Sequence, residues 1–185
     1  MFLRFLRCAC FAGLFALLIS FSRDTAAQTK RVSVDELARA STSVVHGRIT
    51  SVRSFWTDDK HYIMTEVTIR VDDALRGSAP SETILTIPGG RVGSTLYEIS
   101  DMPVFVEGEE VVVFVWEHPS GKKLVTGGIQ GKLTVVEDQV SRRKMVLGVR
   151  ELFNPEVAGK VGDQPVPKEM ALDEFTRRIK EIGQR

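Results

Sequence analysis

Histidine and serine are the residues of this chain best suited to acid–base, metal or nucleophilic chemistry. The three histidines are His46, His61 and His118, and no two share the i, i+2 or i, i+4 spacing of paired metal ligands. His46 follows two valines in a strand-like run, which favours a partly buried or edge histidine; the other two lie in polar turns. No serine lies in a G-x-S-x-G motif. The sequence therefore predicts no catalytic residue, metal site or cofactor, although a Ser–His–Asp site assembled from distant positions stays open.

The stretch IPGGRVG, residues 87–93, has the glycine content of a phosphate-binding loop. Such a loop works because its backbone N–H groups face the anion while a following helix adds its N-terminal dipole. Here STLYEISDMPVFVEGEE follows, without an amphipathic helical pattern, and Ser94 and Thr95 replace the lysine and hydroxyl pair of a Walker loop. We therefore interpret this stretch as a bend at the end of a strand.

Charged residues gather in three carboxylate pairs and one basic cluster. The pairs are Asp58-Asp59, Asp72-Asp73 and Glu109-Glu110, and neighbours in a strand point to opposite faces. This geometry is poor for a shared acid–base site, so we interpret them as solvated turn charges. Residues 142–144, RRK, are expected to keep an edge strand soluble.

Aromatic side chains flank one polar turn. Phe55 and Trp56 precede the tip TDDK, residues 57–60, and His61 and Tyr62 follow it. Aromatic residues are enriched at protein interfaces and among the residues that dominate binding energy. The four residues are therefore our candidate partner-binding site, with the alternative that Trp56 folds back to plug the end of a barrel.

Alternating and doubly apolar runs dominate the chain from Val44 onward. IMTEVTIRVDDAL, residues 63–75, alternates apolar and polar side chains, as in a half-exposed strand. EEVVVFVWE, residues 109–117, is apolar on both faces and predicts a central strand in which Trp116 belongs to the core. About seven short strands with glycine bends, some within strands at Gly47, Gly127 and Gly128, are typical of a small barrel. The expected fold is mainly β: a small OB-like antiparallel barrel with a short helix at each end.

The N-terminus has the three parts of a secretory signal peptide. Two arginines precede the apolar run at residues 8–21, and the small residues Thr25 and Ala27 follow it. We expect cleavage after about Ala27, which places the protein in the periplasm or outside the cell and removes both cysteines, Cys8 and Cys10. The apolar run is shorter than the roughly 20 residues that span a bilayer. An uncleaved anchor stays open as an alternative.

Removal of the leader leaves a chain with little net charge. The 25 basic and 24 acidic side chains fall to 22 and 23, because three arginines and one aspartate leave with residues 1–27. A balanced surface has no general attraction to nucleic acid or to anionic membranes. We therefore expect neither as a partner.

Two helices are expected at the ends of the exported chain. Ser33 and Glu36 have the spacing of a capping box. The tail places Leu172, Phe175, Ile179 and Ile182 on one helical face, with Gly183 after it, so we expect the helix to dock on the barrel. The expected organisation is a signal peptide at 1–27, a β-barrel domain at 28–147, a Pro- and Gly-rich linker at 148–169 and a helix at 170–185.

Four segments together resemble known proteins: STSVVHGRITSV, TEVTIRVDDALRG, VEGEEVVVFV and GGIQGKLTV. They resemble a family of uncharacterised secreted bacterial domains and, more distantly, the OB-type barrel of tissue inhibitors of metalloproteinases and netrin modules. The resemblance covers residues 35–137 and implies the fold. It does not carry over the inhibitory mechanism, because those inhibitors present an N-terminal cysteine to the protease zinc, whereas Gln28 begins the exported chain here.

These observations predict a secreted, non-enzymatic module that binds a secreted or cell-surface protein, with a protease-associated or inhibitor-like role as one form of this function. Two alternatives stay open. One is a small secreted hydrolase with a site assembled from distant residues, and the other is an OB-type barrel that binds an oligosaccharide. The sequence leaves the oligomeric state open.

Overall fold

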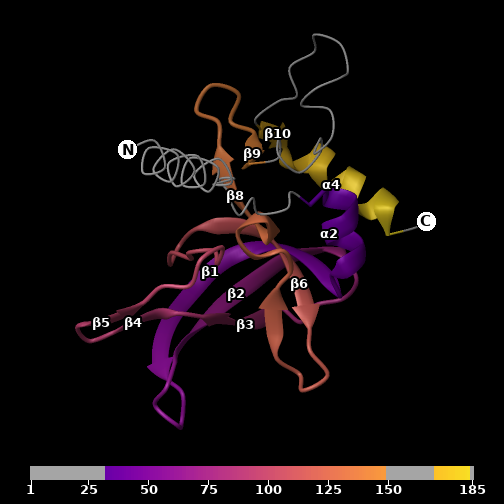
Figure 1. Ribbon diagram of the computed structural model, residues 1–185. Helices are drawn as coiled ribbons and strands as arrows, with labels where there is room; N and C mark the ends of the chain where they lie inside the picture. Colours follow the sequence, from indigo (N-terminus) through magenta and orange to yellow (C-terminus); the bar gives the residue numbers. More distant parts are fainter. Residues whose placement is uncertain (1–31, 149–168, 184–185) are drawn as a thin grey trace, which may run out of the picture. The chain divides into compact units, whose positions relative to one another are not determined.

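The computed structural model describes residues 32–148 and 169–183, and it is mainly β, as predicted (Figure 1). The predicted signal peptide and most of the predicted linker lie outside the described residues. No helix in the described ranges is long and apolar enough to cross a membrane. The strands are β1 Ser43–Trp56, β2 Ile63–Arg76, β3 Glu82–Pro88, β4 Gly90–Val92, β5 Thr95–Tyr97, β6 Glu110–Glu117, β7 Lys123–Val125, β8 Lys132–Glu137, β9 Lys144–Leu147 and β10 Glu169–Ala171.

Five strands close into a barrel in the order β1-β2-β3-β7-β6, because β6 pairs back with β1. The neighbouring strands are antiparallel except β3 and β7, which pair in parallel at Leu85 and Lys123. Strand β1 pairs with β2 along one edge and with β6 along the other. Gly47 lies where the three strands meet, and a Cβ there would come within 2.2 Å of the Arg70 carbonyl oxygen. The closed barrel confirms the expected fold class.

Strand β6 is covered on both faces, as its sequence predicts, and its alternate residues enter two different cores. Val111, Val113 and Val115 face the barrel interior with residues of β1, β2 and β3. Val112 and Phe114 face outward and pack against the helices. Because side chains alternate along a strand, a strand that is buried on both sides must be apolar at every position.

Two α-helices, α2 Val34–Ala40 and α4 Leu172–Ile182, lie side by side and supply the outer layer (Figure 1). The predicted capping box is present in α2: the Ser33 hydroxyl accepts the Glu36 N–H, and the Glu36 carboxylate accepts the Ser33 N–H. Phe175 and Ile179 of α4 have no exposed surface and pack with Phe114, which confirms that the C-terminal helix docks. Gly183 is the predicted C-cap of this helix.

Beyond the barrel, β8 and β9 form a hairpin, and β10 adds a strand that the sequence did not predict. The strand β9, which contains Lys144, lies between β8 and β10, so the prediction that the basic cluster protects an edge strand is wrong. Of the glycines predicted to lie within strands, Gly127 instead caps a short 3-10 helix, Gly128–Gly131, and Gly128 begins it.

The prediction that Trp116 belongs to the core is also wrong. It continues the outward face of Val112 and Phe114 but does not join their cluster, and it is 39% exposed. The ring packs edge-on against His118 at 5.4 Å between centroids. It lies near the end of β6, where the neighbour is the three-residue β7.

Candidate functional site

The turn between β1 and β2 holds its shape through short-range polar contacts. The Thr57 N–H donates to the Tyr62 carbonyl at 2.9 Å, and the Thr57 hydroxyl donates to the Asp59 carboxylate. The His61 N–H also donates to Asp59, and Lys60 takes the left-handed conformation that the turn requires. The Thr57 hydroxyl and then the His61 N–H lower the pKa of Asp59, because both stabilise its ionised form. The turn therefore presents its flanking aromatics from a defined backbone.

The four predicted partner-binding residues do not form one cluster. Trp56 lies opposite Ile63, on the side of the strands that faces inward, and Phe55 lies opposite Met64 on the outward side. The Arg53 guanidinium covers the Phe55 ring at 5.5 Å, and this ring is half-buried.

Trp56, His61 and Tyr62 are the exposed members of the set. Trp56 is 40% exposed and therefore does not plug the barrel as a buried core residue would. Tyr62 is 53% exposed, and its ring lies 6.4 Å from the His61 ring.

A fourth ring, which is half-buried, comes from a segment that sequence reasoning did not include. Tyr97 of β5 places its ring 6.2 Å from that of Tyr62, and Leu96 beside it is 48% exposed. We call the set Trp56, His61, Tyr62, Leu96 and Tyr97 the aromatic rim. Tyr97 is half-buried, and the other four residues are exposed. The only signal in the sequence was the run STLY after the glycine bend, which has no pattern that relates it to the β1–β2 turn.

The glycine bend is what brings this hairpin to the barrel. Gly89 and Gly90 have φ of 96° and 135°, which only glycine adopts readily. A Cβ on Gly90 would lie 2.2 Å from the Thr65 hydroxyl and 2.4 Å from the Ser54 hydroxyl, so β4 approaches the barrel strands without room for a side chain. After Gly93 the chain continues as β5, not as a helix. The prediction of a strand-ending bend is confirmed.

A pocket of about 600 Å³ lies between the hairpin, the barrel strands and the segment that leads to β6. Its floor includes Val67, Ile87 and Phe105, which are core residues of the barrel interior. Leu96 and Tyr97 belong to both its wall and the aromatic rim. Pockets of this size with mostly apolar walls are typical of small-molecule sites at barrel mouths.

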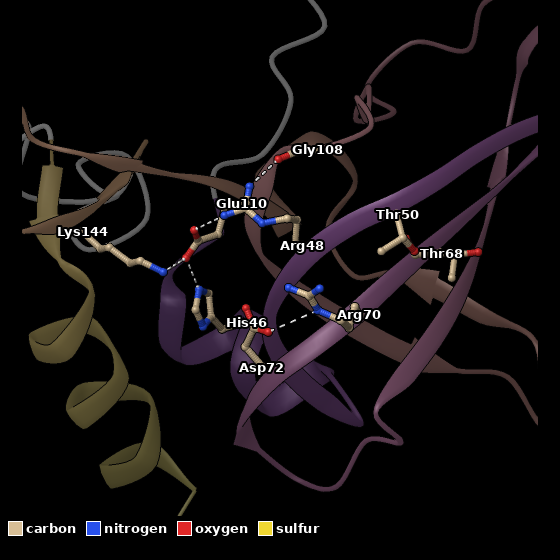
Figure 2. A network of polar contacts seen from close by, with 9 residues as sticks. All are labelled: His46, Arg48, Thr50, Thr68, Arg70, Asp72, Gly108, Glu110 and Lys144. Atoms are coloured by element: carbon tan, nitrogen blue, oxygen red, sulfur yellow. Dashed lines mark hydrogen bonds and ion pairs between the residues drawn. The ribbon is translucent and has the colours of Figure 1, made fainter.

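A separate polar network surrounds Glu110 on the outside of the barrel (Figure 2). Its Oε1 accepts hydrogen bonds from His46 Nε2 and Lys144 Nζ, both at 2.7 Å, and its Oε2 accepts from Arg48 at 3.0 Å. Arg48 also donates to the Gly108 carbonyl at 2.7 Å. Burial raises the pKa of Glu110, but the hydrogen bonds and charges of Lys144 and His46 lower it by more, so the net pKa lies below its ordinary value.

This network corrects the prediction that the Glu109-Glu110 pair is solvated. The Glu110 side chain is only 10% exposed, and Glu109 binds Lys132 at 2.7 Å with 18% exposure. The partners lie far away in the sequence, so the doublet alone had no signal for them.

The Glu110 network joins strands and has few features of a catalytic site. His46 and Glu110 form a histidine–carboxylate pair, but in the described residues no hydroxyl side chain is hydrogen-bonded to the His46 ring. His61 lies 3.4 Å from Asp59, and His118 bonds Ser120 in another turn. Within residues 32–148 and 169–183, no group of three or more histidines, cysteines and carboxylates is arranged to hold a metal ion.

In comparisons with known proteins, no family model, no curated protein and no solved structure matches this chain. The resemblance to secreted bacterial domains and to inhibitor and netrin barrels stays a prediction. The site is therefore defined by its own geometry, which is a rigid turn and a hairpin that share an aromatic rim beside an apolar pocket.

Proposed function

We propose that this protein is a secreted, non-enzymatic module that binds another secreted or cell-surface protein through the aromatic rim. The observation that carries the proposal is the contact between Tyr62 and Tyr97. Two segments remote in sequence bring their rings to 6.2 Å, yet Tyr62 stays 53% exposed. Exposed aromatics that neither enter a core nor scatter singly are typical of binding surfaces.

The surroundings of the rim support a binding role. The β1–β2 turn is ordered by its own hydrogen bonds, so little conformational entropy is lost when a partner binds. Tyrosine and tryptophan offer large contact areas with only two side-chain torsions to fix. Leu96 extends the apolar surface next to Tyr97.

A site-specific crosslink tests the proposal in the producing cell. A photoreactive phenylalanine analogue at position 62 is expected to form an adduct with a protein of the extracellular or periplasmic fraction. The same analogue at position 140 should form none, since Val140 is 93% exposed but lies in the β8–β9 turn, away from the rim. Equal adducts at both positions, or none at position 62, would refute the proposal.

The energetic contribution of the rim is then measured with the partner so identified. Trp56→Ala is expected to weaken binding by more than about 2 kcal/mol, as is usual for an aromatic residue that dominates a binding surface. Trp116→Ala is the matched control, because Trp116 is 39% exposed against 40% for Trp56 and lies outside the rim. Both variants should retain their thermal stability to within a few degrees, since neither tryptophan is a core residue. Loss of binding in both variants alike would contradict the proposed site.

A further inference from the structure

The pocket beside the aromatic rim carries an inference that does not depend on the proposed protein partner. We propose that this pocket binds a small amphiphilic molecule, with its apolar body against the barrel floor and one anionic group on the guanidinium of Arg91. The volume of about 600 Å³ falls in the range of small-molecule sites, and the floor residues Val67, Ile87 and Phe105 are apolar.

Two hydroxyl groups that line the pocket, those of Ser54 and Thr65, are already hydrogen-bonded to each other and to the backbone. The Thr65 hydroxyl donates to the Gly89 carbonyl at 2.7 Å, so the 2.8 Å contact with Ser54 requires the Ser54 hydroxyl to donate to Thr65. Ser54 in turn accepts the N–H of Arg91 at 3.3 Å. Because neither hydroxyl has a proton to spare, neither can donate a hydrogen bond to a ligand, so this part of the pocket favours an apolar group over one that needs a donor.

The mouth of the pocket carries a positively charged side chain that has no partner in the described part of the chain. Arg91 lines the pocket and is exposed, and within residues 32–148 and 169–183 its guanidinium has no hydrogen bond, ion pair or ring contact. Other exposed arginines of the barrel strands have partners: Arg48 binds Glu110, and Arg53 binds Glu66. A guanidinium binds carboxylate, sulfonate or phosphate oxygens with two parallel hydrogen bonds.

Glu98 lies at the same pocket mouth and limits the negative charge that a ligand can carry there. Its carboxylate is exposed and likewise has no partner among the described residues. A second negative group on the ligand would meet repulsion from Glu98, so one anionic group on the side of Arg91 is favoured. Removal of the Arg91 charge and removal of the Glu98 charge are therefore expected to have opposite effects on the binding of an anionic ligand.

The test uses two dyes with the same ring system. Anilinonaphthalene sulfonate carries one sulfonate, and phenylnaphthylamine is its neutral counterpart. We expect both to bind the full exported chain with enhanced fluorescence, the sulfonate more tightly. Val52→Phe, which inserts a ring into the pocket from its lining, should abolish binding of both dyes, while Tyr62→Ala on the aromatic rim should leave it unchanged.

Charge variants test the role of the two charged side chains at the pocket mouth. Arg91→Gln should weaken sulfonate binding about tenfold, because it removes a charge-assisted contact. Glu98→Gln should tighten sulfonate binding about twofold, and neither variant should change binding of the neutral dye. Arg142→Gln, on the β8–β9 turn, is the control for overall charge and should have no effect.

The natural source of the anionic group is decided by displacement of the sulfonate dye. Displacement by dodecanoate indicates a free fatty acid. Displacement by an apolar peptide with a free C-terminus, but not by its amide, indicates the end of another chain. The first result supports the proposal, and the second contradicts it, because the ligand would then be another chain and not a small molecule. The proposal is also overturned if neither compound displaces the dye, if both dyes bind equally, if Arg91→Gln has no effect, or if dye binding survives Val52→Phe in a variant that remains folded.

Discussion

Replacement of Glu110 by glutamine removes the negative charge on which His46, Arg48 and Lys144 converge. The amide keeps the size of the carboxylate but has only one acceptor oxygen. In either orientation its NH2 group faces a donor: Arg48 on the Oε2 side, or Lys144 on the Oε1 side. Glu110→Gln therefore breaks at least one charge-assisted hydrogen bond and removes the ion pairs.

The expected loss in the free energy of unfolding follows from the burial of each partner of Glu110. A hydrogen bond to a charged group contributes roughly 1.5–3 kcal/mol when both groups are withdrawn from water. His46 and Glu110 are both 10% exposed, but Arg48 and Lys144 are 45% and 48% exposed and can return to water. After this discount, we expect Glu110→Gln to lower the free energy of unfolding by about 2–3 kcal/mol at pH 7.

The effect should depend on pH in one direction. The pKa of Glu110 in the folded chain lies below its ordinary value, so ionised Glu110 contributes stability above the unfolded pKa of about 4.3. This contribution is lost as the pH falls through the lower, folded pKa. The stability difference between wild type and Glu110→Gln should therefore shrink from pH 7 toward about pH 3.

Denaturant unfolding of both proteins at the two pH values measures this difference. Glu82→Gln is the control, since Glu82 is exposed at the start of β3 and its carboxylate has no hydrogen bond or ion pair in the described ranges. This substitution should change stability by less than about 0.5 kcal/mol. A Glu110→Gln loss as small as that of the control, or one that is the same at both pH values, would refute the role assigned to the network.

Two further substitutions test the elements around the site and the core. Gly90→Ala should destabilise the protein by about 2 kcal/mol or more, because it adds a clash to a strained backbone, whereas Gly93→Ala, with open space around it, should lose only about 1 kcal/mol. Equal losses in thermal unfolding would show that the close approach of β4 to Ser54 and Thr65 is unimportant. Phe175→Ala should lose about 3–5 kcal/mol through the cavity left beneath α4, and an unchanged melting temperature would contradict the docking of this helix.

Much of the barrel was predictable because its signals are local. The alternation through residues 63–75 and the doubly apolar run of β6 depend only on neighbours two positions apart. The Ser33 and Glu36 capping box likewise closes within one turn of helix. Trp116 shows the limit of this reasoning. The sequence correctly placed it on the same face as Val112 and Phe114, but it could not show that the cluster formed with the helices does not extend to Trp116.

The proposed binding surface was only half predictable. The sequence identified Trp56, His61 and Tyr62 beside a polar turn, because aromatics next to turn residues are visible along the chain. Tyr97 was missed, although its ring contacts that of Tyr62, since nothing in STLY relates it to a turn so much earlier in the chain.

By itself, the sequence determined the mainly β fold, the two helices near the ends of the described chain and the bend at Gly89 and Gly90. Periodicity, capping and backbone freedom act over only a few residues, so they can be recognised along the chain. Only the tertiary structure decided what these features build. The closure of β1 against β6 brings His46 to Glu110, 64 positions away, and the glycine bend turns Arg91 to the mouth of a pocket whose floor comes from other strands. Such contacts depend on strand register across the whole barrel, and register is set by the packing of all the strands together.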